Sequence, residues 1–254
     1  MIKAGRGASA MFKENHRFYR YQHRDKEGWV AFQTRYRETD LWIRAQRSLE
    51  KEALAAVLNC RRQLEGYIAQ FPDFLHSLIP LPDDPLAPAL VRQMLQAAQQ
   101  AGVGPMASVA GAIAQSVGLS LSPLTPAIII ENGGDCYLNL QEDVKVGIFA
   151  GPDSPFTGKI ALRFTADRFP LGICTSSGTI GPSLSFGTAD AVTVVSPDAA
   201  LADAAATALG NLVKKPHDIN KALDLAPGIP SVEGVLIIAE DKIGIWGNLE
   251  LIPV

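Results

Sequence analysis

One continuous unit of the chain joins a strand to a helix. Residues 191–195 are small or β-branched and predict a short strand, and residues 199–212 are good helix formers. Between them, Ser196 and Pro197 predict the N-cap and the first turn of the helix. Any fold of this chain must therefore place a strand and a helix in direct succession.

Two oxygen-bearing side chains share one face of that predicted helix. Asp203 and Thr207 lie four residues apart, on a different face from the packing stripe of Leu201, Ala205 and Leu209. Asp203 lies about two turns into the helix, too deep for the dipole of that helix to stabilise its charge. Carboxylate and hydroxyl oxygens are the ligands that Mg²⁺ prefers. The pair is a candidate metal site; the alternative is that Asp203 faces solvent and Thr207 bonds a backbone carbonyl.

The composition is that of a globular chain with a sizeable core. Of its 254 residues, 47% are hydrophobic and 19% are charged. We expect a tail over residues 1–16 and a single domain over residues 17–254, or two intertwined subdomains within it. Residues 1–62 carry 14 Lys and Arg against 7 Asp and Glu, and the remainder carries 9 against 19. No dense basic run accompanies this asymmetry, so we expect no nucleic-acid partner.

Cysteine usage and the start of the chain bear on the compartment. Cys60, Cys136 and Cys174 are widely spaced, odd in number and set among apolar neighbours, which predicts buried thiols in a reducing compartment. The first residues lack the apolar segment of a signal peptide, and no stretch reads as long enough to span a bilayer. We therefore expect a cytoplasmic protein with no membrane partner.

The pattern of short strands and helices predicts the fold class. Alternating residues predict two or three strands in 17–44, and regular apolar spacing predicts a helix over 48–70. Four prolines in 78–88 predict a linker. Further helices are predicted at 86–100 and 105–117, and further strands at 127–131, 136–140, 144–149, 159–164, 171–175, 235–239 and 242–246. Helices set between runs of strands indicate an α+β fold with a largely antiparallel sheet.

The first of three glycine-bearing loops opens the helix over 105–117. It contains Gly102, Gly104, Pro105 and Met106, and the free amides of a helix start attract phosphate or carboxylate. A helix-to-helix turn without a ligand uses similar residues, so that alternative stays open. The helix itself is rich in small residues such as Gly111, which would let another backbone approach closely.

The second loop follows a buried strand and reads Asn132, Gly133, Gly134 and Asp135. A hairpin turn explains the glycines. Carboxylates at a strand end can also bind ribose hydroxyls or a metal, which makes Asp135 a candidate site residue and leaves both interpretations open.

The third loop, residues 172–190, is rich in hydroxyls and glycines. Such clusters of hydroxyls and unpaired amides can surround a phosphate or the edge of a flavin. The candidate binding residues are Thr175, Ser176, Ser177, Gly178, Ser183 and Ser185. None of the three loops follows GxGxxG or GxxxxGK[ST], and the chain has no GxSxG and no close histidine pair. The Rossmann, P-loop and serine-hydrolase classes are thus unsupported.

Four segments together resemble a known family. They read AGVGPMASVAGAIA, ENGGD, TSSGTIGPSLSFGTAD and VTVVSPDAALADAAATALGN, and they are similar to the uncharacterised ApbE-like branch of the ApbE flavin-transferase superfamily. The resemblance runs from about residue 18 to the C-terminus. It implies that FAD or FMN is bound with Mg²⁺, that Asp203 and Thr207 hold the metal, that 102–106 cover the diphosphate, and that 132–135 and 175–178 wall the nucleotide.

One segment departs from the family pattern. Where flavin transferases carry a stretch similar to HIIDPRTG, with a histidine implicated in catalysis, residues 181–187 read GPSLSFG. Only Asp190 or a neighbouring serine could serve as the base there. Pro105 also stands near the place of the family's usual lysine. Binding of a phosphorylated small molecule is therefore implied more firmly than transfer of FMN.

Three function classes follow from these patterns. The first is an enzyme with a flavin nucleotide or related ligand; the resemblance implies a context in sulfur assimilation, specifically homocysteine formation. The second is a non-catalytic carrier or accessory module that serves partner enzymes. The third is a sulfur-handling protein that uses Cys136 or Cys174, although the apolar neighbours of both favour packing. The small-residue helix and the hairpin over 235–246 would also allow a homodimer.

Overall fold

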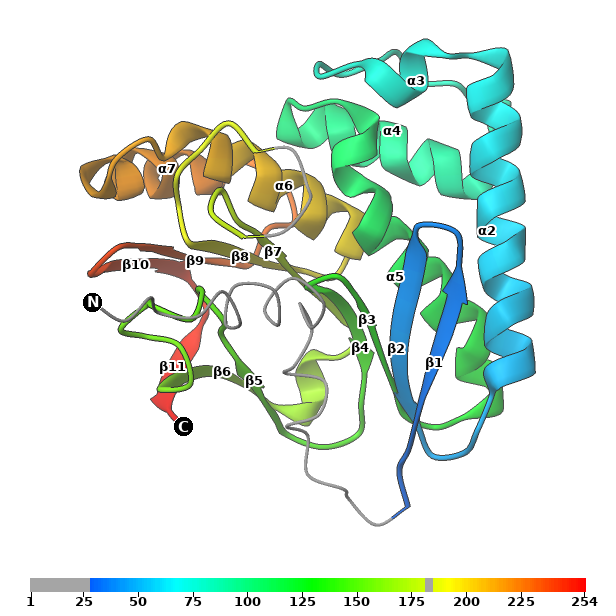
Figure 1. The fold of residues 1–254 in the computed structure, drawn as a ribbon, viewed down its shortest axis with the longest axis horizontal. Coiled ribbons are helices and arrows are strands. Elements are labelled where there is room, and N and C mark those ends of the chain that lie inside the picture. Colours follow the sequence, from blue (N-terminus) through cyan, green and yellow to red (C-terminus); the bar gives the residue numbers. More distant parts are fainter. Residues whose placement is uncertain (1–27, 181–184) are drawn as a thin grey trace, which may run out of the picture.

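The computed structural model describes residues 28–180 and 185–254. The expected tail over 1–16, the strand pattern before residue 28 and the candidate Ser183 lie outside the described residues. Within the described part, eleven β-strands form two sheets, and helices cover one face of the larger sheet (Figure 1). This confirms the α+β class with a largely antiparallel sheet.

The larger sheet has eight strands, and each neighbouring pair is antiparallel. Their order across the sheet is β1 (Val30–Tyr36), β2 (Thr39–Ala45), β3 (Ile128–Asn132), β4 (Asp135–Asn139), β7 (Leu171–Ser176), β8 (Ala191–Ser196), β9 (Gly234–Ala239) and β10 (Lys242–Gly247). The smaller sheet has the order β11 (Glu250–Pro253), β6 (Ile160–Phe164), β5 (Val144–Gly147).

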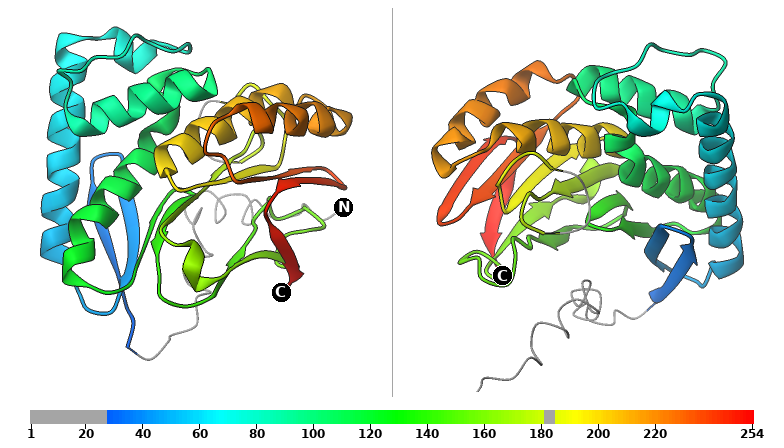
Figure 2. Two further views of the ribbon diagram at one scale, coloured as in Figure 1. Left: turned by 180° about the vertical axis from the view of Figure 1, so that it is seen from behind. Right: turned by 45° about the horizontal axis from the view of Figure 1, so that its top comes forward.

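The principal helices lie on one side of the larger sheet, and the smaller sheet lies on the other (Figure 2). They are α2 (Glu50–Gln70), α3 (Asp73–His76), α4 (Ala89–Ala101), α5 (Val109–Leu121), α6 (Ala199–Leu212) and α7 (Ile219–Leu225). A 3₁₀ turn, η2 (Pro105–Ser108), precedes α5. The helix predicted from residue 105 thus begins with a tighter turn and continues to Leu121.

Side-chain alternation along the strands creates two apolar cores. In β7 and β8, Cys174 and Val194 are paired and face the helices, whereas Ile173 and Val195 are paired and face the smaller sheet. Every residue of β8 is buried, because both faces of this strand are covered. The small and β-branched residues that predicted the strand suit a strand whose two faces are both covered.

The N-cap of α6 differs from the sequence prediction. β8 continues to Ser196, which pairs with Gly172, so the helix begins two residues later than expected. Asp198 is the N-cap: its side chain accepts hydrogen bonds from the amides of Ala200 at 2.9 Å and Leu201 at 3.4 Å. The prediction of Ser196 and Pro197 was therefore wrong, because strand pairing holds Ser196 in the sheet.

Replacing this cap gives a simple test of the helix start. Asp198→Ala should lower the free energy of unfolding by about 1 kcal/mol, since two first-turn amides lose their acceptor. Asp224→Ala, which removes an exposed acid from α7, is the control and should change the value by less than about 0.5 kcal/mol. If urea denaturation gave the same change in the free energy of unfolding for both variants, Asp198 would not be the N-cap of α6.

One helical stretch, Pro105–Leu124, meets the length and hydropathy of a membrane span, contrary to the sequence expectation that no stretch would. This test by composition is weak support for a span. The middle of the stretch, α5, packs against α2, α6, β3 and β4, as a core helix does.

Candidate functional site

Helix α6 lies along β7 at close range. A Cβ on Gly172 would fall 2.3 Å from the Cα of Ala199, so a side chain at this position would separate the two elements. Two residues further along β7, the Cys174 thiol donates a hydrogen bond to the carbonyl of Ala199 at 3.3 Å. At the other end of α6, Gly210 lies beside the side chain of Ser176. This parallel course holds the face of α6 that carries Asp203 close to the sheet.

The first turn of α5 meets Asp203. The amide of Gly111 donates to Oδ2 of Asp203 at 2.9 Å, and the amide of Ala110 also interacts with this carboxylate. On the other side, Nδ2 of Asn132 donates to the carbonyl of Ala110 at 3.1 Å. The first amides of a helix lack intrahelical partners and carry its positive dipole end. Asp203 therefore caps a neighbouring helix.

This contact corrects the expectation that a stabilising role for Asp203 would be weak. That expectation considered only the dipole of its own helix, whereas the stabilising dipole belongs to α5. The approach requires a glycine, because a Cβ on Gly111 would fall 2.1 Å from the carbonyl oxygen of Ala199. The close approach predicted from small residues in this helix is confirmed.

The two-glycine turn is a hairpin that positions Asn132 and Asp135. Gly133 and Gly134 have φ of 72° and 116°, which favour glycine, and they join β3 to β4. Asn132 and Asp135 are paired across the turn, so their side chains share the helix-facing side of the sheet. Glu131 points to the other side, and its Oε1 accepts the amide of Gly134 at 3.1 Å. The segment Asn132–Asp135 is therefore a hairpin turn, and this does not exclude a role in ligand binding.

Asp135 is a buried acid, and one oxygen of its carboxylate lacks a hydrogen-bond partner in the part of the chain that the structure describes. Its residue is 8% exposed, and among the described residues its Oδ1 is the one buried side-chain N or O atom without a hydrogen-bond partner. Burial raises the pKa of Asp135 well above its ordinary value, and the nearby charges of Asp203 and Glu131 raise it further. The Thr175 amide, which donates to this carboxylate, and the neighbouring Cys174 thiol lower the pKa.

Asp203 shares this environment. It is half-buried, and burial raises its pKa from 3.8 to about 7 although the amides of Gly111 and Ala110 lower it. The charge of Asp203, on α6, thus raises the pKa of Asp135, which faces it from the sheet. Thr207 follows one turn later on α6 and is also half-buried.

The oxygen donors present here suit a hard cation. Two neighbouring carboxylates and a hydroxyl are hard ligands, and the unpartnered oxygen of Asp135 is an available donor. The described residues contain no group of three or more His, Cys, Asp and Glu side chains arranged to hold a metal. A hard cation held by Asp135 and Asp203 would therefore need further oxygen ligands.

The other predicted hydroxyls have different surroundings. Thr175 faces away from α6, and its hydroxyl lies 2.9 Å from that of Thr193. Ser176 faces α6. The hydroxyl of Ser177 accepts the amides of Thr179 and Ile180, and that of Ser185 accepts the amide of Gly187, so both stabilise their own loop. Gly178 donates its amide to Ala189.

The two glycines of the first loop are required by the backbone conformation and by close packing. Gly102 ends α4 in the left-handed conformation with φ 73°, and its amide donates to Ala98. A Cβ on Gly104 would fall 1.8 Å from the carbonyl oxygen of Ser77. Pro105 is buried and Met106 packs beside the helix-side core. Phosphate binding by this loop stays a prediction.

Phe186, which lies in the segment that departs from the flavin-transferase pattern, contacts the C-terminal end of α6. The amide of Phe186 donates to Oδ1 of Asn211 at 2.9 Å, and the ammonium of Lys214 donates to the Phe186 carbonyl. Asp190 accepts the Glu240 amide at 2.7 Å and the Thr179 hydroxyl at 3.1 Å. The sequence analysis assigned no contact to Asn211, the last residue of the fourth motif, or to Lys214, which lies outside the four motifs.

The cysteines pack into the two apolar cores. All three are free, and Cys60 and Cys174 are buried. Burial raises the pKa of Cys174 well above its ordinary value, and the charges of Asp135 and Asp203 add to the effect. Cys136 is paired with Ile173 and faces the other side of the sheet from Cys174. Packing, the interpretation that the sequence favoured, agrees with this arrangement.

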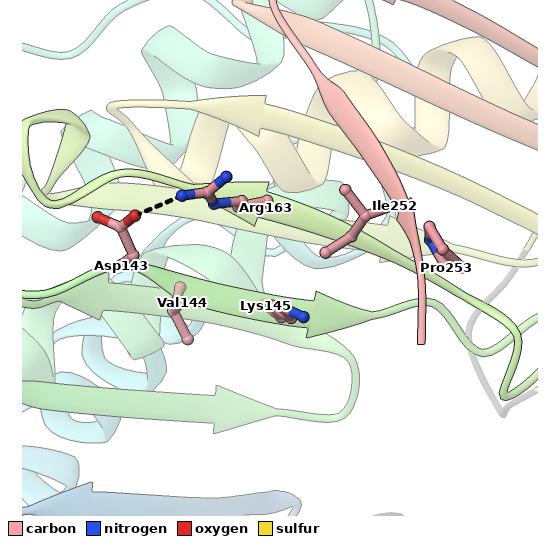
Figure 3. A pocket seen from close by; sticks show the side chains of 6 residues that line it. All are labelled: Asp143, Val144, Lys145, Arg163, Ile252 and Pro253. Atoms are coloured by element: carbon pink, nitrogen blue, oxygen red, sulfur yellow. Dashed lines mark hydrogen bonds and ion pairs between the residues drawn. The ribbon is translucent and has the colours of Figure 1, made fainter.

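A separate hollow of about 520 Å³ lies on the smaller sheet (Figure 3). Its lining includes Lys145, Ile252 and the ion pair of Arg163 with Asp143, whose shortest N–O distance is 3.0 Å. It lies on β5, β6 and β11 and contains none of the predicted site residues.

Solved structures share this fold. The flavin transferase ApbE from Vibrio cholerae has a TM-score of 0.54 at 10% identity, over 86% of this chain and 96% of that chain. The apo flavinyl transferase ApbE from Pseudomonas stutzeri has a TM-score of 0.57 at 14% identity, over 86% and 94%. At these identities the likeness concerns the fold.

Sequence relatives define the family. A family model described as AbpE bacteria matches residues 20–227. A UPF0280 protein from Methanocaldococcus jannaschii is 40% identical over 87% of this chain and 92% of its own length. Another, from Methanocella arvoryzae, is 41% identical over 84% and 86%. The resemblance predicted from the four motifs is confirmed, and the chain belongs to the ApbE-like family described as AbpE bacteria, together with the UPF0280 proteins.

Proposed function

We propose that this protein binds a flavin nucleotide, FAD or FMN, or a related phosphorylated small molecule together with Mg²⁺. The observation that carries the proposal is the unpartnered, buried Oδ1 of Asp135 next to Asp203, at the first turn of α5. The fold shared with flavin transferases supports the ligand class. In this proposal the site lies between the Asn132–Asp135 turn, β7 and α6.

Each group has a role in that proposal. Asp203 and Thr207 hold the metal, while Asn132 and the Gly111 amide fix the first turn of α5 against them. Bound Mg²⁺ would neutralise phosphate charge. Ser176 and the backbone of residues 175–178 form one wall of the nucleotide site, and Gly102 to Met106 form another. The predicted contribution of the Thr175 side chain is dropped from the proposal, because that side chain lies on the other side of the sheet.

The reaction has two candidates. An enzymatic step needs a base, and both oxygens of Asp190 already accept hydrogen bonds that hold its loop. The absence of histidine from residues 181–187 favours the second candidate, a non-catalytic carrier or accessory module that serves partner enzymes in sulfur assimilation. Transfer of FMN to an acceptor threonine, or Mg²⁺-dependent hydrolysis of FAD, would exclude that candidate. We place the protein in the cytoplasm and allow for a homodimer within the same proposal.

Calorimetric titration tests the ligand and the metal together. FAD, FMN and ADP are each titrated into the full-length protein with and without Mg²⁺. We expect one of them to bind at least about tenfold more tightly with Mg²⁺. Asp203→Asn should remove this gain, because it loses the charge but keeps an oxygen that can accept the Gly111 amide.

The matched control is Asp241→Asn, the same change on the exposed β9–β10 turn, which should bind as the wild type does. Affinity that is unaltered by Mg²⁺ and by Asp203→Asn would end the metal assignment. If FAD, FMN and ADP all failed to bind, the nucleotide proposal would be wrong, and sulfur metabolites would be the next compounds to titrate.

A further inference from the structure

Asp135 occupies a position that the family resemblance does not assign to the metal. It is the first residue of β4, directly after the glycine turn, and its side chain lies on the helix-facing side of the sheet with that of Asn132. Asn132 and Asp203 contact the same turn of α5 through Ala110 and Gly111. Asp135 therefore lies beside the carboxylate that the motif marks as the metal ligand.

The two oxygens of Asp135 cannot both be satisfied by the protein. The Thr175 amide and the Cys174 thiol reach this carboxylate, yet Oδ1 has no hydrogen-bond partner within the described part of the chain. The residue is only 8% exposed, so bulk water does not replace the missing partner. A buried polar atom left without a partner costs free energy, and native structures usually supply a proton, water or ion.

Charge points to a cation. Asp203 and Asp135 are close enough for each charge to disfavour the other, and Glu131 adds to the repulsion. Across residues 28–180 and 185–254, no Lys, Arg or His forms an ion pair with Asp135 or Asp203. In the described part of the chain, backbone amides of α5 and β7 donate to the pair. Two neighbouring carboxylates that no Lys, Arg or His of the described residues neutralises offer hard oxygen ligands to a divalent cation.

We propose that Asp135 is a direct ligand of the divalent cation that Asp203 holds, so that the metal bridges the sheet and α6. This inference rests on the proposed function and deepens it by adding a ligand from the glycine turn. Thr207 lies one turn further along α6 and is half-buried, so its hydroxyl would be a further candidate ligand.

Binding of Mn²⁺ measured by electron paramagnetic resonance tests the proposal without any activity. Full-length protein is titrated with Mn²⁺ alone and then with saturating FAD, and Mg²⁺ is used as competitor. The wild type should bind one Mn²⁺, and Asp135→Asn and Asp203→Asn should each weaken binding by about tenfold or more. The control Asp241→Asn should leave the affinity unchanged, and Asp135→Ser is the second variant if Asp135→Asn does not fold.

The outcomes separate the two proposals. Wild-type affinity in folded Asp135→Asn, with loss in Asp203→Asn, would overturn the role of Asp135 and leave the proposed function intact. Absence of Mn²⁺ binding while FAD still binds would overturn the inference and leave the flavin half of the function. Absence of both would overturn the inference and the function together. Protection of the wild type by Mg²⁺ in thermal unfolding, lost in Asp135→Asn, would support the proposal independently.

Discussion

Gly111→Ala should destabilise the protein by about 3 kcal/mol. The added Cβ would fall 2.1 Å from the Ala199 carbonyl oxygen and 2.9 Å from the Cβ of Asp203, so α5 and α6 must move apart. Their separation would also lengthen the hydrogen bond from the Gly111 amide to Asp203. Urea denaturation of the wild type and the variant gives the difference in the free energy of unfolding.

Gly66→Ala is the matched control. Gly66 lies within α2, and a Cβ there would have no atom within 4 Å. The same exchange should therefore stabilise the protein by roughly 0.5–1 kcal/mol, the ordinary gain for alanine over glycine in a helix. If both variants changed stability by the same amount, the close approach of α5 and α6 would not be a constraint on the fold.

The metal-free protein should lose stability as the pH rises from about 4 to about 7. Asp203 has a pKa of about 7 in the folded state and an ordinary value of 3.8, so the folded state binds its proton more tightly. The contribution is fully present below pH 3.8 and is lost through pH 7, with a size on the order of 2–4 kcal/mol. Asp135, whose pKa is also raised, acts in the same direction.

The comparison with Asp203→Asn isolates this effect. Other acids, such as Glu38 and Asp218, have lowered pKa values and favour the folded state as the pH rises, but they are common to both proteins. In a chelator, the variant should match the wild type near pH 4 and exceed its free energy of unfolding near pH 8. Added Mg²⁺ should stabilise only the wild type. Parallel curves across this range would show that burial does not raise the pKa of Asp203.

Local pattern was sufficient for most of the elements. The apolar run of β8, the amphipathic spacing of α2 and the glycine that ends α4 predicted their elements to within a few residues, because each depends on periodicity or on one turn residue. Sequence reasoning missed α7 and β11. Both are short, and β11 is stabilised by pairing with β6, about ninety residues earlier, which no local pattern reveals.

The candidate site was predictable in its residue types and not in its grouping. Motif spacing selected Asp203, Thr207 and the glycine turn with Asp135, since carboxylates and glycines at element ends are visible in one dimension. Gly111 was marked for close packing, yet its hydrogen bond to Asp203 depends on two helices that are about ninety residues apart in sequence. Asn211 and Lys214 likewise acquire their contacts with Phe186 only in the folded chain.

The sequence by itself determined the family, the α+β class and which acids could bind a ligand, because these follow from residue type, periodicity and motif order. Only the tertiary structure decided that Asp203 caps α5, that Thr175 faces away from α6, and that Asp135 lies beside Asp203 with an unpartnered oxygen. The physical reason is that burial, charge repulsion and helix dipoles act between atoms close in space. Strand pairing and the packing of α5 against α6 bring those atoms together.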